Sequence, residues 1–398
     1  MKILLLNSDL AKNRGDRVIT EGIVQLIRET YPDATITALS EEAVRDRDWF
    51  GIEFLPMGSD SLNPWHWITL ARAAGQADRI FWGGGELLKD YTNQLGLWYW
   101  CIKIIWLRLF NSSIYGAYQG IGPTSSPLSR RIICFVVNRT KHFILRDAES
   151  YKKLQSWGVD AEKLTASIDP AILPETTPLS TEDFDTLHEF GLSKEFLDDF
   201  VAIAPRDWFH YRKGQVLPYR WRAKLPGNTV DPRNRQYRQR LINLANLALK
   251  RTERVLLLPM HMGEDIALCQ EIAAATESPE RVFVADKDTL PPALLRKVLA
   301  TARLMIGFRL HATIIATSAS TPSLNIYYVD KGRIYFDQIR QSSNAYPIEA
   351  VLDDDFDTDI ALKVDELLQS QDKCRQDLQN AMQRLRFDAR QSFKKLNV

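Results

Sequence analysis

The stretch RLMIGFRLHATIIA at residues 303–316 decides how the second half of the chain folds. Its apolar residues at 304–306 predict a short buried strand, Gly307 predicts a turn, and the residues after 308 predict a helix. Arg309 and His311 are two positions apart, so in an extended turn their side chains project to the same side. We therefore expect both between the carboxyl end of a strand and the amino end of a helix, where open α/β sheets bind ligands and anions.

The residue types at this junction suit a negatively charged ligand. The guanidinium of Arg309 can hold a carboxylate or a phosphate through paired hydrogen bonds, and His311 can carry a proton near neutral pH. The same two residues could equally cap a packed helix, because a single Arg-x-His pattern is a weak signal. The spacing alone leaves both interpretations open.

The bulk properties are those of an ordinary globular protein. The chain has 398 residues, a formal net charge of +1, 45% hydrophobic residues and 25% charged residues, which suggests two or three domains. The near-neutral charge argues against general nucleic-acid binding. The four cysteines are far apart and no histidine pair has ligand spacing, so we expect no metal site and a reducing, cytoplasmic compartment. The apolar run near the N-terminus indicates a first buried strand and not a signal peptide.

The order of elements predicts two halves of the same kind. An apolar run at 2–6, an amphipathic helix at 17–30 and a second apolar run at 35–39 favour a doubly wound parallel sheet. The alternation starts again with a strand at 201–204, so the predicted fold class is α/β with two Rossmann-like domains. The expected parts are a first domain at 1–180, a linker at 181–200, a second domain at 201–345, and C-terminal helices at 346–398 that pack back toward the first domain.

Three turns of the first half follow predicted strands. Residues 13–16 read NRGD, residues 83–86 read GGGE, and residues 119–123 read QGIGP. Glycines at the carboxyl end of a strand let backbone amides approach a ligand closely, although tight packing would also select them. None of these turns matches the G-x-G-x-x-G or P-loop patterns that bind nucleotides.

Two further segments have an unusual composition. Residues 206–240 contain ten arginines and lysines interleaved with six aromatic residues. This pattern favours a loop that faces a phosphate, a sugar or an anionic membrane over the plain solvated loop that charge runs usually form. Residues 95–110, LGLWYWCIKIIWLRLF, are too short and too interrupted for a membrane span. Plain burial is the favoured interpretation of this apolar helix, and membrane contact is the other.

Taken in order, the motifs resemble those of the polysaccharide pyruvyl transferase family. The resemblance covers residues 1–340 and rests on NRGD at 13–16, GGGELL at 83–88, QGIGP at 119–123, Arg146-Asp147, Arg309-Leu310-His311, and Tyr328 with Lys331. It implies a fold like that of the two-domain GT-B glycosyltransferases, with two Rossmann-like halves facing a cleft. It also implies transfer of the pyruvyl unit of phosphoenolpyruvate to two hydroxyls of one sugar, which forms a cyclic ketal and releases phosphate.

The resemblance places the donor site in the second domain. Arg309 and His311 carry over directly from the family's motif, and Arg206 matches a second donor-binding arginine. Phosphoenolpyruvate is a compact polyanion whose carboxylate and phosphate both need cations, and Arg206, Arg309 and Lys331 can supply them. His261 would line the pocket, and His311 is the candidate acid that protonates the methylene carbon. Phosphoenolpyruvate is a co-substrate, and no cofactor is expected.

The first domain would then hold the acceptor, a sugar of a polysaccharide or of a lipid-linked oligosaccharide. Asp16 and Glu86 are the candidate bases for the acceptor hydroxyl, and Asp16 joins Arg309 and His311 as a candidate catalytic residue. Capping of the first helix is the alternative role of Asp16. Arg146 and Asp147 are expected to form a structural ion pair. The residues assigned to acceptor binding are Asn13, Gly15, Asp16, Gly84, Gly85, Glu86 and Gln119.

Two other functions remain open at this point. A glycosyltransferase that uses a nucleotide sugar would have the same fold, and a non-catalytic saccharide-binding protein would bind a sugar without turnover. Acceptors in the family are often lipid-linked, so the resemblance also implies contact with the inner face of a membrane. The segment 207–240 is the candidate for that contact.

Overall fold

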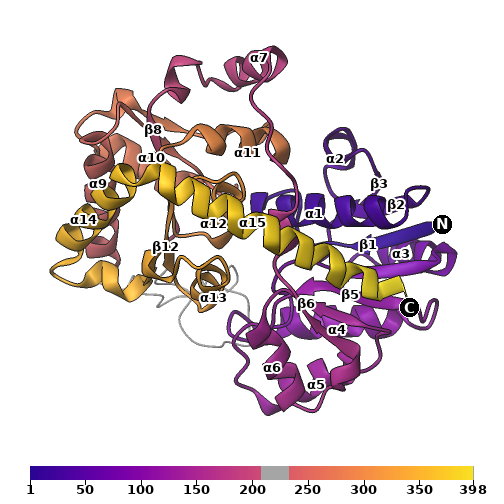
Figure 1. Cartoon of the computed structure of the whole chain (residues 1–398). Helices are drawn as coiled ribbons and strands as arrows, with labels where there is room; N and C mark the ends of the chain where they lie inside the picture. Colours follow the sequence, from indigo (N-terminus) through magenta and orange to yellow (C-terminus); the bar gives the residue numbers. More distant parts are fainter. Residues whose placement is uncertain (208–232, 398) are drawn as a thin grey trace. The chain divides into compact units, whose positions relative to one another are not determined.

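The computed structural model describes residues 1–207 and 233–397, which form two compact units (Figure 1). Unit 1 contains residues 1–173 together with 385–397, and unit 2 contains residues 174–207 and 233–384. Each unit is built on a parallel sheet with helices packed against it. No helix in the described part of the chain is both long and apolar enough to span a bilayer.

The sheet of unit 1 has seven strands in the order β3-β2-β1-β4-β5-β6-β7. Leu4 in the central strand β1 pairs with Thr37 of β2 and with Ile80 of β4. Because helices cover both faces, the central strands are buried and largely apolar, as their sequences predict. The strands are β1 (Lys2–Leu6), β2 (Thr35–Ser40), β3 (Glu53–Pro56), β4 (Arg79–Gly83), β5 (Ile114–Gln119), β6 (Phe143–Leu145) and β7 (Leu164–Ala166).

The helices of unit 1 begin at residues whose side chains cap them. Asn63, Ser126 and Asp147 each accept a hydrogen bond from a backbone N–H in the first turn of the helix that follows. The core beneath these helices includes Trp82, whose ring lies 5.8 Å from that of Phe143. The helices are α1 (Arg14–Thr30), α2 (Ala43–Phe50), α3 (Pro64–Gln76), α4 (Gln94–Leu107), α5 (Pro127–Val137) and α6 (Ala148–Ser156), with short 3₁₀ turns η1 (Ala161–Lys163) and η2 (Pro170–Ile172).

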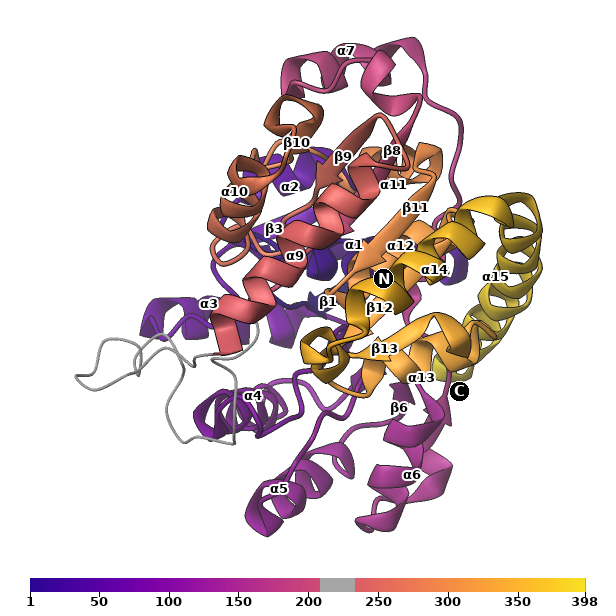
Figure 2. The same cartoon turned by 90° about the vertical axis from the view of Figure 1, so that its left-hand side faces the viewer.

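The sheet of unit 2 has six strands in the order β10-β9-β8-β11-β12-β13. Ile306 of β11 pairs with Ile203 of β8 on one side and with Leu324 of β12 on the other. Figure 2 shows this sheet with α9 and α14 in front of it. The strands are β8 (Phe200–Ala204), β9 (Arg254–Leu257), β10 (Val282–Val284), β11 (Leu304–Gly307), β12 (Ser323–Tyr327) and β13 (Ala345–Pro347).

The helices of unit 2 pack in groups on its sheet. α9 contacts α10 and α14, and α11 contacts α12. The helices are α7 (Thr181–Phe190), α9 (Arg233–Leu249), α10 (Ile266–Ala275), α11 (Pro292–Thr301), α12 (Leu310–Ser318), α13 (Lys331–Gln338), α14 (Phe356–Gln369) and α15 (Gln371–Lys394), with 3₁₀ turns η3 (Glu195–Leu197), η5 (Pro279–Arg281), η6 (Ser342–Asn344), η7 (Ile348–Leu352) and η8 (Lys395–Asn397).

Each strand order contains one switch point. In unit 1 the chain runs outward from β1 to β3 and then returns to β4, which lies beside β1. In unit 2 it runs outward from β8 to β10 and returns to β11, which lies beside β8. Loops after the two strands at a switch point diverge, which is why open α/β sheets bind ligands there. Ligand-binding residues are therefore expected in the loops after β1 and β4 in unit 1, and after β8 and β11 in unit 2.

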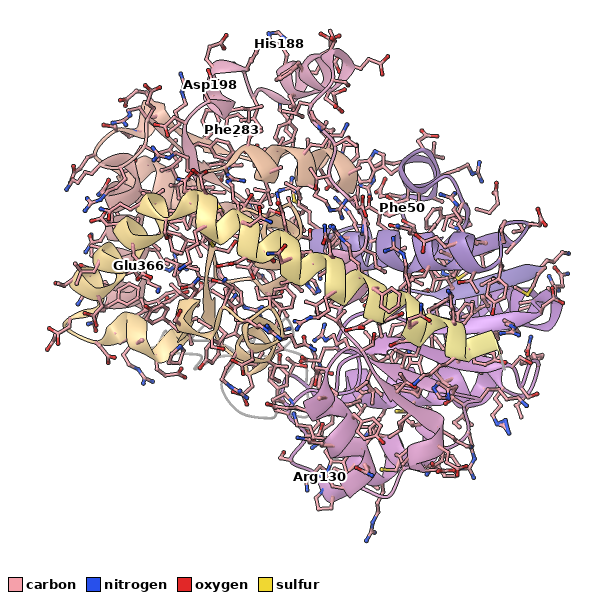
Figure 3. The ribbon with its side chains drawn as sticks, viewed as in Figure 1. Phe50, Arg130, His188, Asp198, Phe283 and Glu366 are labelled. Atoms are coloured by element: carbon pink, nitrogen blue, oxygen red, sulfur yellow. The ribbon has the colours of Figure 1, made fainter. Side chains whose placement is uncertain are left out.

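Residues 181–200, expected to be a linker, are instead a folded part of unit 2. They form α7 and η3, and Ser180 starts α7 through a capping box with Asp183. The rings of Phe190 and Phe196 each lie 5.9 Å from the ring of Phe283 in β10. Figure 3 labels Phe283. Acidic residues of this segment lie on a short amphipathic helix whose other side buries Leu187 and Phe190.

The C-terminal residues are divided between the units. α14 and α15 up to residue 384 belong to unit 2, whereas residues 385–397 belong to unit 1. There the hydroxyl of Tyr118 donates to the carbonyl oxygen of Ala389 at 2.7 Å, and the ring of Phe393 stacks on that of Tyr118. Of the segment 346–398, expected to pack back toward the first domain, only this last part belongs to unit 1.

The basic segment 206–240 is described only at its two ends. Residues 208–232 lie outside the described residues, and with them most of the predicted membrane-contact segment 207–240. Residues 233–240 are the first turns of α9. Arg238 in these turns pairs with Asp207 at 2.6 Å, so this basic residue has an acidic partner within unit 2.

Candidate functional site

The switch point of unit 2 brings two of the predicted donor-binding arginines together. Arg206 follows β8 and Arg309 follows β11, and these strands are neighbours in the sheet. Gly307 is the last residue of β11. A Cβ at this position would lie only 2.4 Å from Cγ2 of Thr313, so a glycine lets α12 pack close to the strand. Arg309 is the N-cap residue of α12, with extended backbone. Both guanidinium groups thus leave the sheet at the edge where ligands bind.

Arg309 is held by a carboxylate from the neighbouring loop. Its Nε donates to Oδ2 of Asp265 at 3.0 Å and its Nη2 donates to Oδ1 at 2.5 Å, while Nη2 also lies 3.3 Å from Glu264. Burial by itself would lower the pKa of Arg309, but the charge and hydrogen bonds of Asp265 outweigh it and raise the pKa above its ordinary value. Among the described residues, no protein acceptor contacts Nη1 of Arg309, so this nitrogen can donate to a ligand.

Asp265 is the residue of this site that sequence reasoning missed. Its side chain is 1% exposed, and Oδ2 accepts from the backbone N–H groups of Met260 and His261 at 3.2 and 2.8 Å. The carboxylate therefore ties the loop after β9 to the guanidinium of Arg309. The available signal in the sequence is an acidic residue four positions after His261, close to the end of a strand.

Arg206 lies against an aromatic ring. It is buried, and its guanidinium carbon is 3.9 Å from the ring centroid of Tyr328, which follows β12. Nζ of Lys331 lies 5.5 Å from the same ring centroid. Cations near an aromatic face are stabilised by the quadrupole of the ring. Tyr328 therefore connects two of the three cations that the sequence assigned to the donor.

A buried tyrosine fixes the backbone beneath Arg206. The hydroxyl of Tyr237 in α9 donates to the carbonyl oxygen of Arg206 at 2.7 Å, and its ring packs edge-on against Phe308. Burial raises the pKa of Tyr237 well above its ordinary value, so the hydroxyl keeps its proton and remains a donor. Phe308 immediately precedes Arg309, so the side chain of Tyr237 contacts both the backbone of Arg206 and the residue before Arg309.

The two histidines have different settings. His311 lies in the first turn of α12 and is partly buried. His261 is also partly buried, and its Nδ1 accepts from the backbone N–H of Gly263 at 3.2 Å. The backbone N–H of His261 donates to Asp265, which links it to Arg309. All predicted donor residues therefore follow four strands of one sheet, namely β8, β9, β11 and β12.

The predicted acceptor residues of unit 1 lie at its own switch point. Asn13 caps α1, since its side-chain oxygen accepts from the backbone N–H of Gly15 at 2.9 Å. Asp16 is therefore not the helix cap, which corrects the alternative role expected for it, and it lies in the first turn of α1. A Cβ on Gly85, after β4, would be 3.7 Å from Oδ1 of Asp16 and 3.2 Å from Oγ of Ser8. The two loops of the switch point thus meet at Gly85.

The glycines of the GGGE turn are required by the backbone. Gly84 and Gly85 have φ of 82° and 83°, a region that L-residues with side chains rarely occupy. A Cβ on Gly84 would also collide with Cγ2 of Ile19, at 2.4 Å. The turn is thus selected both by conformation and by its contact with α1, and packing accounts for Gly84 without a ligand.

Glu86 forms a buried ion pair. Its side chain is 6% exposed, and Oε2 accepts from Nη2 of Arg146 at 3.1 Å, while Nη1 of Arg146 donates to Asp169 at 3.1 Å. Burial would lower the pKa of Arg146, but Asp169 and Glu86 raise it overall. The structural pair expected between Arg146 and Asp147 is therefore made with Glu86 and Asp169 instead. Asp147 caps α6 by accepting from the backbone N–H of Ser150.

Gln119 is fully buried at the end of β5. Its Nε2 donates to the carbonyl oxygen of Trp82 at 3.3 Å, which joins β5 to β4. Within the described residues its Oε1 has no hydrogen-bond partner. The buried amide of Gln119 thus contacts the strand that precedes the GGGE turn. The described parts of the chain contain no group of three or more histidine, cysteine or acidic side chains that could hold a metal ion.

Two parallel-sheet α/β units with sites at their switch points define the GT-B class, and solved structures agree. HepE from Anabaena, solved with UDP-glucose, has a TM-score of 0.57 and 13% identity over 100% of this chain and 98% of its own. The UDP-GlcNAc 2-epimerase from Neisseria meningitidis has a TM-score of 0.57 and 9% identity over 100% and 99% of the chains. For the E. coli ADP-heptose LPS heptosyltransferase II these values are 0.53 and 14%, over 94% and 100%. Identities this low show the fold alone, and they confirm the predicted GT-B-like class.

Within this class the chain belongs to the polysaccharide pyruvyl transferase family. The model of that family matches residues 13–330, which begin at Asn13 and include Arg309 and His311. Among curated proteins, the amylovoran biosynthesis protein AmsJ of Erwinia amylovora is 22% identical in an alignment 425 positions long, gaps included, which covers 97% of each chain. The family predicted from the order of the motifs is therefore confirmed.

Proposed function

We propose that the protein transfers the pyruvyl group of phosphoenolpyruvate to two hydroxyls of a sugar in a polysaccharide or lipid-linked glycan precursor. The observation that carries the proposal is the pair Arg206 and Arg309 at the switch point of unit 2, with Asp265 fixing the plane of Arg309. A ligand with one carboxylate and one phosphate matches two positively charged guanidinium groups. On Arg309 the donor to the ligand is Nη1, because Asp265 engages Nε and Nη2. Lys331, near the Tyr328 ring, adds a third positive charge.

The proposed reaction needs an acid for the methylene carbon and a base for the acceptor hydroxyl. His311 protonates the methylene carbon of phosphoenolpyruvate, which makes the adjacent carbon electrophilic. One acceptor hydroxyl forms the first C–O bond there, the C–O bond to phosphate breaks, and the second hydroxyl forms the other C–O bond. Of the two hydroxyl protons, one replaces the proton given by His311 and one leaves with phosphate. Asp16 of unit 1 is the proposed base for the acceptor hydroxyl.

The acceptor side of the proposal rests on the loops of unit 1. Asp16 and Gly85 meet at the switch point, where backbone N–H groups and a carboxylate can bind sugar hydroxyls. Glu86 is a weaker candidate for the base than the sequence suggested, because its carboxylate is paired with Arg146. The name of AmsJ supports a polysaccharide as the product, and we propose an exopolysaccharide or cell-wall precursor made on the cytoplasmic side of the membrane.

The test is acceptor-dependent release of phosphate from phosphoenolpyruvate. A panel of galactose-, mannose- and glucose-type acceptors should contain one that stimulates release, and His311→Ala should abolish it. His188→Ala is the matched control, because His188 lies exposed on α7 (Figure 3) and should leave release unchanged.

The competing donor is a nucleotide sugar, since HepE of the same fold was solved with UDP-glucose. Calorimetry with phosphoenolpyruvate and with UDP-glucose separates the two. Binding of phosphoenolpyruvate that Arg309→Ala abolishes supports the proposal. Binding of UDP-glucose without binding of phosphoenolpyruvate would replace it with a glycosyltransferase. Binding of a sugar with no turnover of either donor would indicate the non-catalytic alternative.

A further inference from the structure

One stretch of unit 1 contains no acidic residue. Between Tyr91 and Arg146 the sequence has no aspartate or glutamate, although a quarter of the whole chain is charged. The stretch forms α4, β5, α5 and β6. Its basic residues are Lys103, Arg108, Arg130, Arg131, Arg139, Lys141 and Arg146. The helices α4 and α5 pack against each other, so their outer faces are neighbours on the surface.

The outer face of α5 alternates apolar and basic side chains. Leu128, Arg131 and Phe135 are spaced by three or four residues, which places them on one face of the helix, and Arg139 follows two residues after the helix ends. All four are exposed, and Phe135 retains 47% of its accessible surface. The guanidinium carbon of Arg139 lies 3.3 Å from the ring centroid of Phe135. Figure 3 shows Arg130, also exposed, at the outer edge of unit 1 beside this face.

The outer face of α4 is apolar. Ile102 is 62% exposed, and Leu109 and Phe110 are exposed just after the helix ends. Arg108 adds a partly exposed basic residue there. The favoured expectation of plain burial for residues 95–110 therefore holds for only one side of the helix. Its other side presents large apolar groups to the outside.

The neighbouring helix α3 extends this surface. It packs on α4, and the ring centroids of Trp67 and Trp106 are 5.0 Å apart. At its start Trp65 is 73% exposed, and Ile68 is exposed one turn later. α3 also contains no acidic residue. We call this surface the outer face of α3–α5, and it consists of Trp65, Ile68, Ile102, Arg108, Leu109, Phe110, Leu128, Arg131, Phe135 and Arg139.

We propose that the outer face of α3–α5 binds the surface of an anionic lipid bilayer. Tryptophan, phenylalanine and leucine insert at the boundary between headgroups and acyl chains, and arginines beside them attract anionic headgroups. None of the residues that make up this face is acidic, so no carboxylate within it repels the anionic headgroups. An anionic bilayer therefore matches this face both in charge and in its apolar groups.

Other occupants fit this face less well. A second copy of the chain would bring the same arginines together, because a symmetric dimer uses the same patch on both subunits. A nucleic acid would meet the positive charge but would gain little from exposed isoleucine and leucine. The proposal does not depend on the donor, and the face is separate in sequence from residues 207–240. It would place unit 1, which we propose holds the acceptor, at the membrane.

The test is co-sedimentation with vesicles of equal parts phosphatidylglycerol and phosphatidylcholine, compared with vesicles of phosphatidylcholine alone. The full chain should bind the anionic vesicles and lose binding as salt is raised. Arg131→Glu should weaken binding at least about fivefold, the change expected for one basic residue near an anionic surface. The double variant Ile102→Ser with Phe135→Ser should weaken it about tenfold, because two apolar groups no longer insert.

Matched controls are exposed residues of unit 2. Leu362→Ser and Lys373→Glu make the same chemical changes on α14 and α15, and neither should alter binding. Thermal melts that match the wild type show that the variants fold, and phosphate release with a soluble acceptor should stay unchanged. This readout separates the lipid-binding proposal from the proposed reaction.

Three outcomes would overturn the proposal. The first is no binding to anionic vesicles at low salt. The second is binding that the α4 and α5 variants weaken no more than the controls do, which would assign it to another segment such as 207–240. The third is self-association in sedimentation velocity that Ile102→Ser with Phe135→Ser abolishes while vesicle binding is unchanged, which would make the face a contact between two copies of the chain.

Discussion

The guanidinium of Arg309 is bound through two of its nitrogens to both oxygens of Asp265, at 3.0 and 2.5 Å. This pair is 44 residues apart in sequence and joins the loops after β9 and β11. A fork-to-fork contact fixes both the position and the plane of a guanidinium. Arg309 is therefore oriented before any ligand arrives, and Nη1 is the nitrogen that remains for a ligand.

Arg309→Lys should impair phosphoenolpyruvate use more than it impairs folding. A lysine keeps the charge but cannot bind both oxygens of Asp265 and a ligand at once. We expect kcat/KM for phosphoenolpyruvate to fall about 100-fold, a loss of about 2.7 kcal/mol in transition-state stabilisation. Steady-state phosphate release measures this. Arg303→Lys, which alters a half-exposed pair with Asp199 in the same unit, is the control and should change kcat/KM little.

The ring of Tyr328 should contribute to donor binding. The ring lies 3.9 Å from the guanidinium carbon of Arg206, so Tyr328→Phe keeps the contact and Tyr328→Leu removes it. A partly desolvated cation–π contact is worth about 1 kcal/mol, so the leucine variant should bind phosphoenolpyruvate roughly fivefold more weakly, as measured by calorimetry. Equal affinities for the two variants would show that the ring does not position Arg206 for the donor.

Removal of the charge should mainly lower stability at Glu86 and mainly lower kcat at Asp16. Glu86→Gln breaks a buried pair with Arg146, so it should lower the free energy of unfolding by about 3 kcal/mol and leave kcat close to the wild-type value. Asp16→Asn removes a charge from the first turn of α1, which costs about 0.5 kcal/mol. If Asp16 is the base, its substitution should lower kcat about 100-fold.

Urea unfolding and phosphate release on the same preparations distinguish the two effects. A stable Glu86→Gln variant with a large loss of kcat would return the catalytic role to Glu86. A fully active Asp16→Asn variant would remove Asp16 from the mechanism.

Lys103 should make the stability of the protein depend on pH. Its Nζ lies 4.4 Å from the ring centroid of Tyr99 and 4.7 Å from that of Trp100 in α4, and it donates to the carbonyl oxygen of Ser59. Burial lowers the pKa of Lys103 to about 7, against the opposing charge of Asp60. In the unfolded chain a lysine keeps its proton up to about pH 10. Between these values the unfolded state binds more protons, so stability rises with pH.

Lys103→Met removes this titration. Below pH 7 the wild type buries a charge, so the variant has its greatest relative stability there, and this advantage should shrink by about 2 kcal/mol between pH 7 and pH 9. Urea unfolding at several pH values measures the difference. Lys373→Met at an exposed position should show no such trend, and parallel profiles for the wild type and Lys103→Met would mean that Lys103 keeps its proton when folded.

The sequence by itself determined the local elements and their order. Apolar runs such as 2–6 and glycine turns such as GGGE at 83–86 depend on neighbours within a few residues. For that reason the α/β class, the two halves and the junction at Arg309 and His311 could be predicted. The family was predicted from a resemblance, because six short motifs follow one another along the chain in the order that the family shows. The division at 181–200 was missed, since an exposed amphipathic helix and a linker have similar composition.

The tertiary structure alone decided which side chains meet. Arg146 was expected beside Asp147, but it pairs with Glu86 and with Asp169, 60 and 23 residues away. Asp265 reaches Arg309 only because β9 and β11 lie on either side of β8 in the sheet. Strand order is set by packing over the whole unit, and no local pattern encodes it. The sequence therefore named most residues of the candidate site, while the fold determined the partners that give each charge its role.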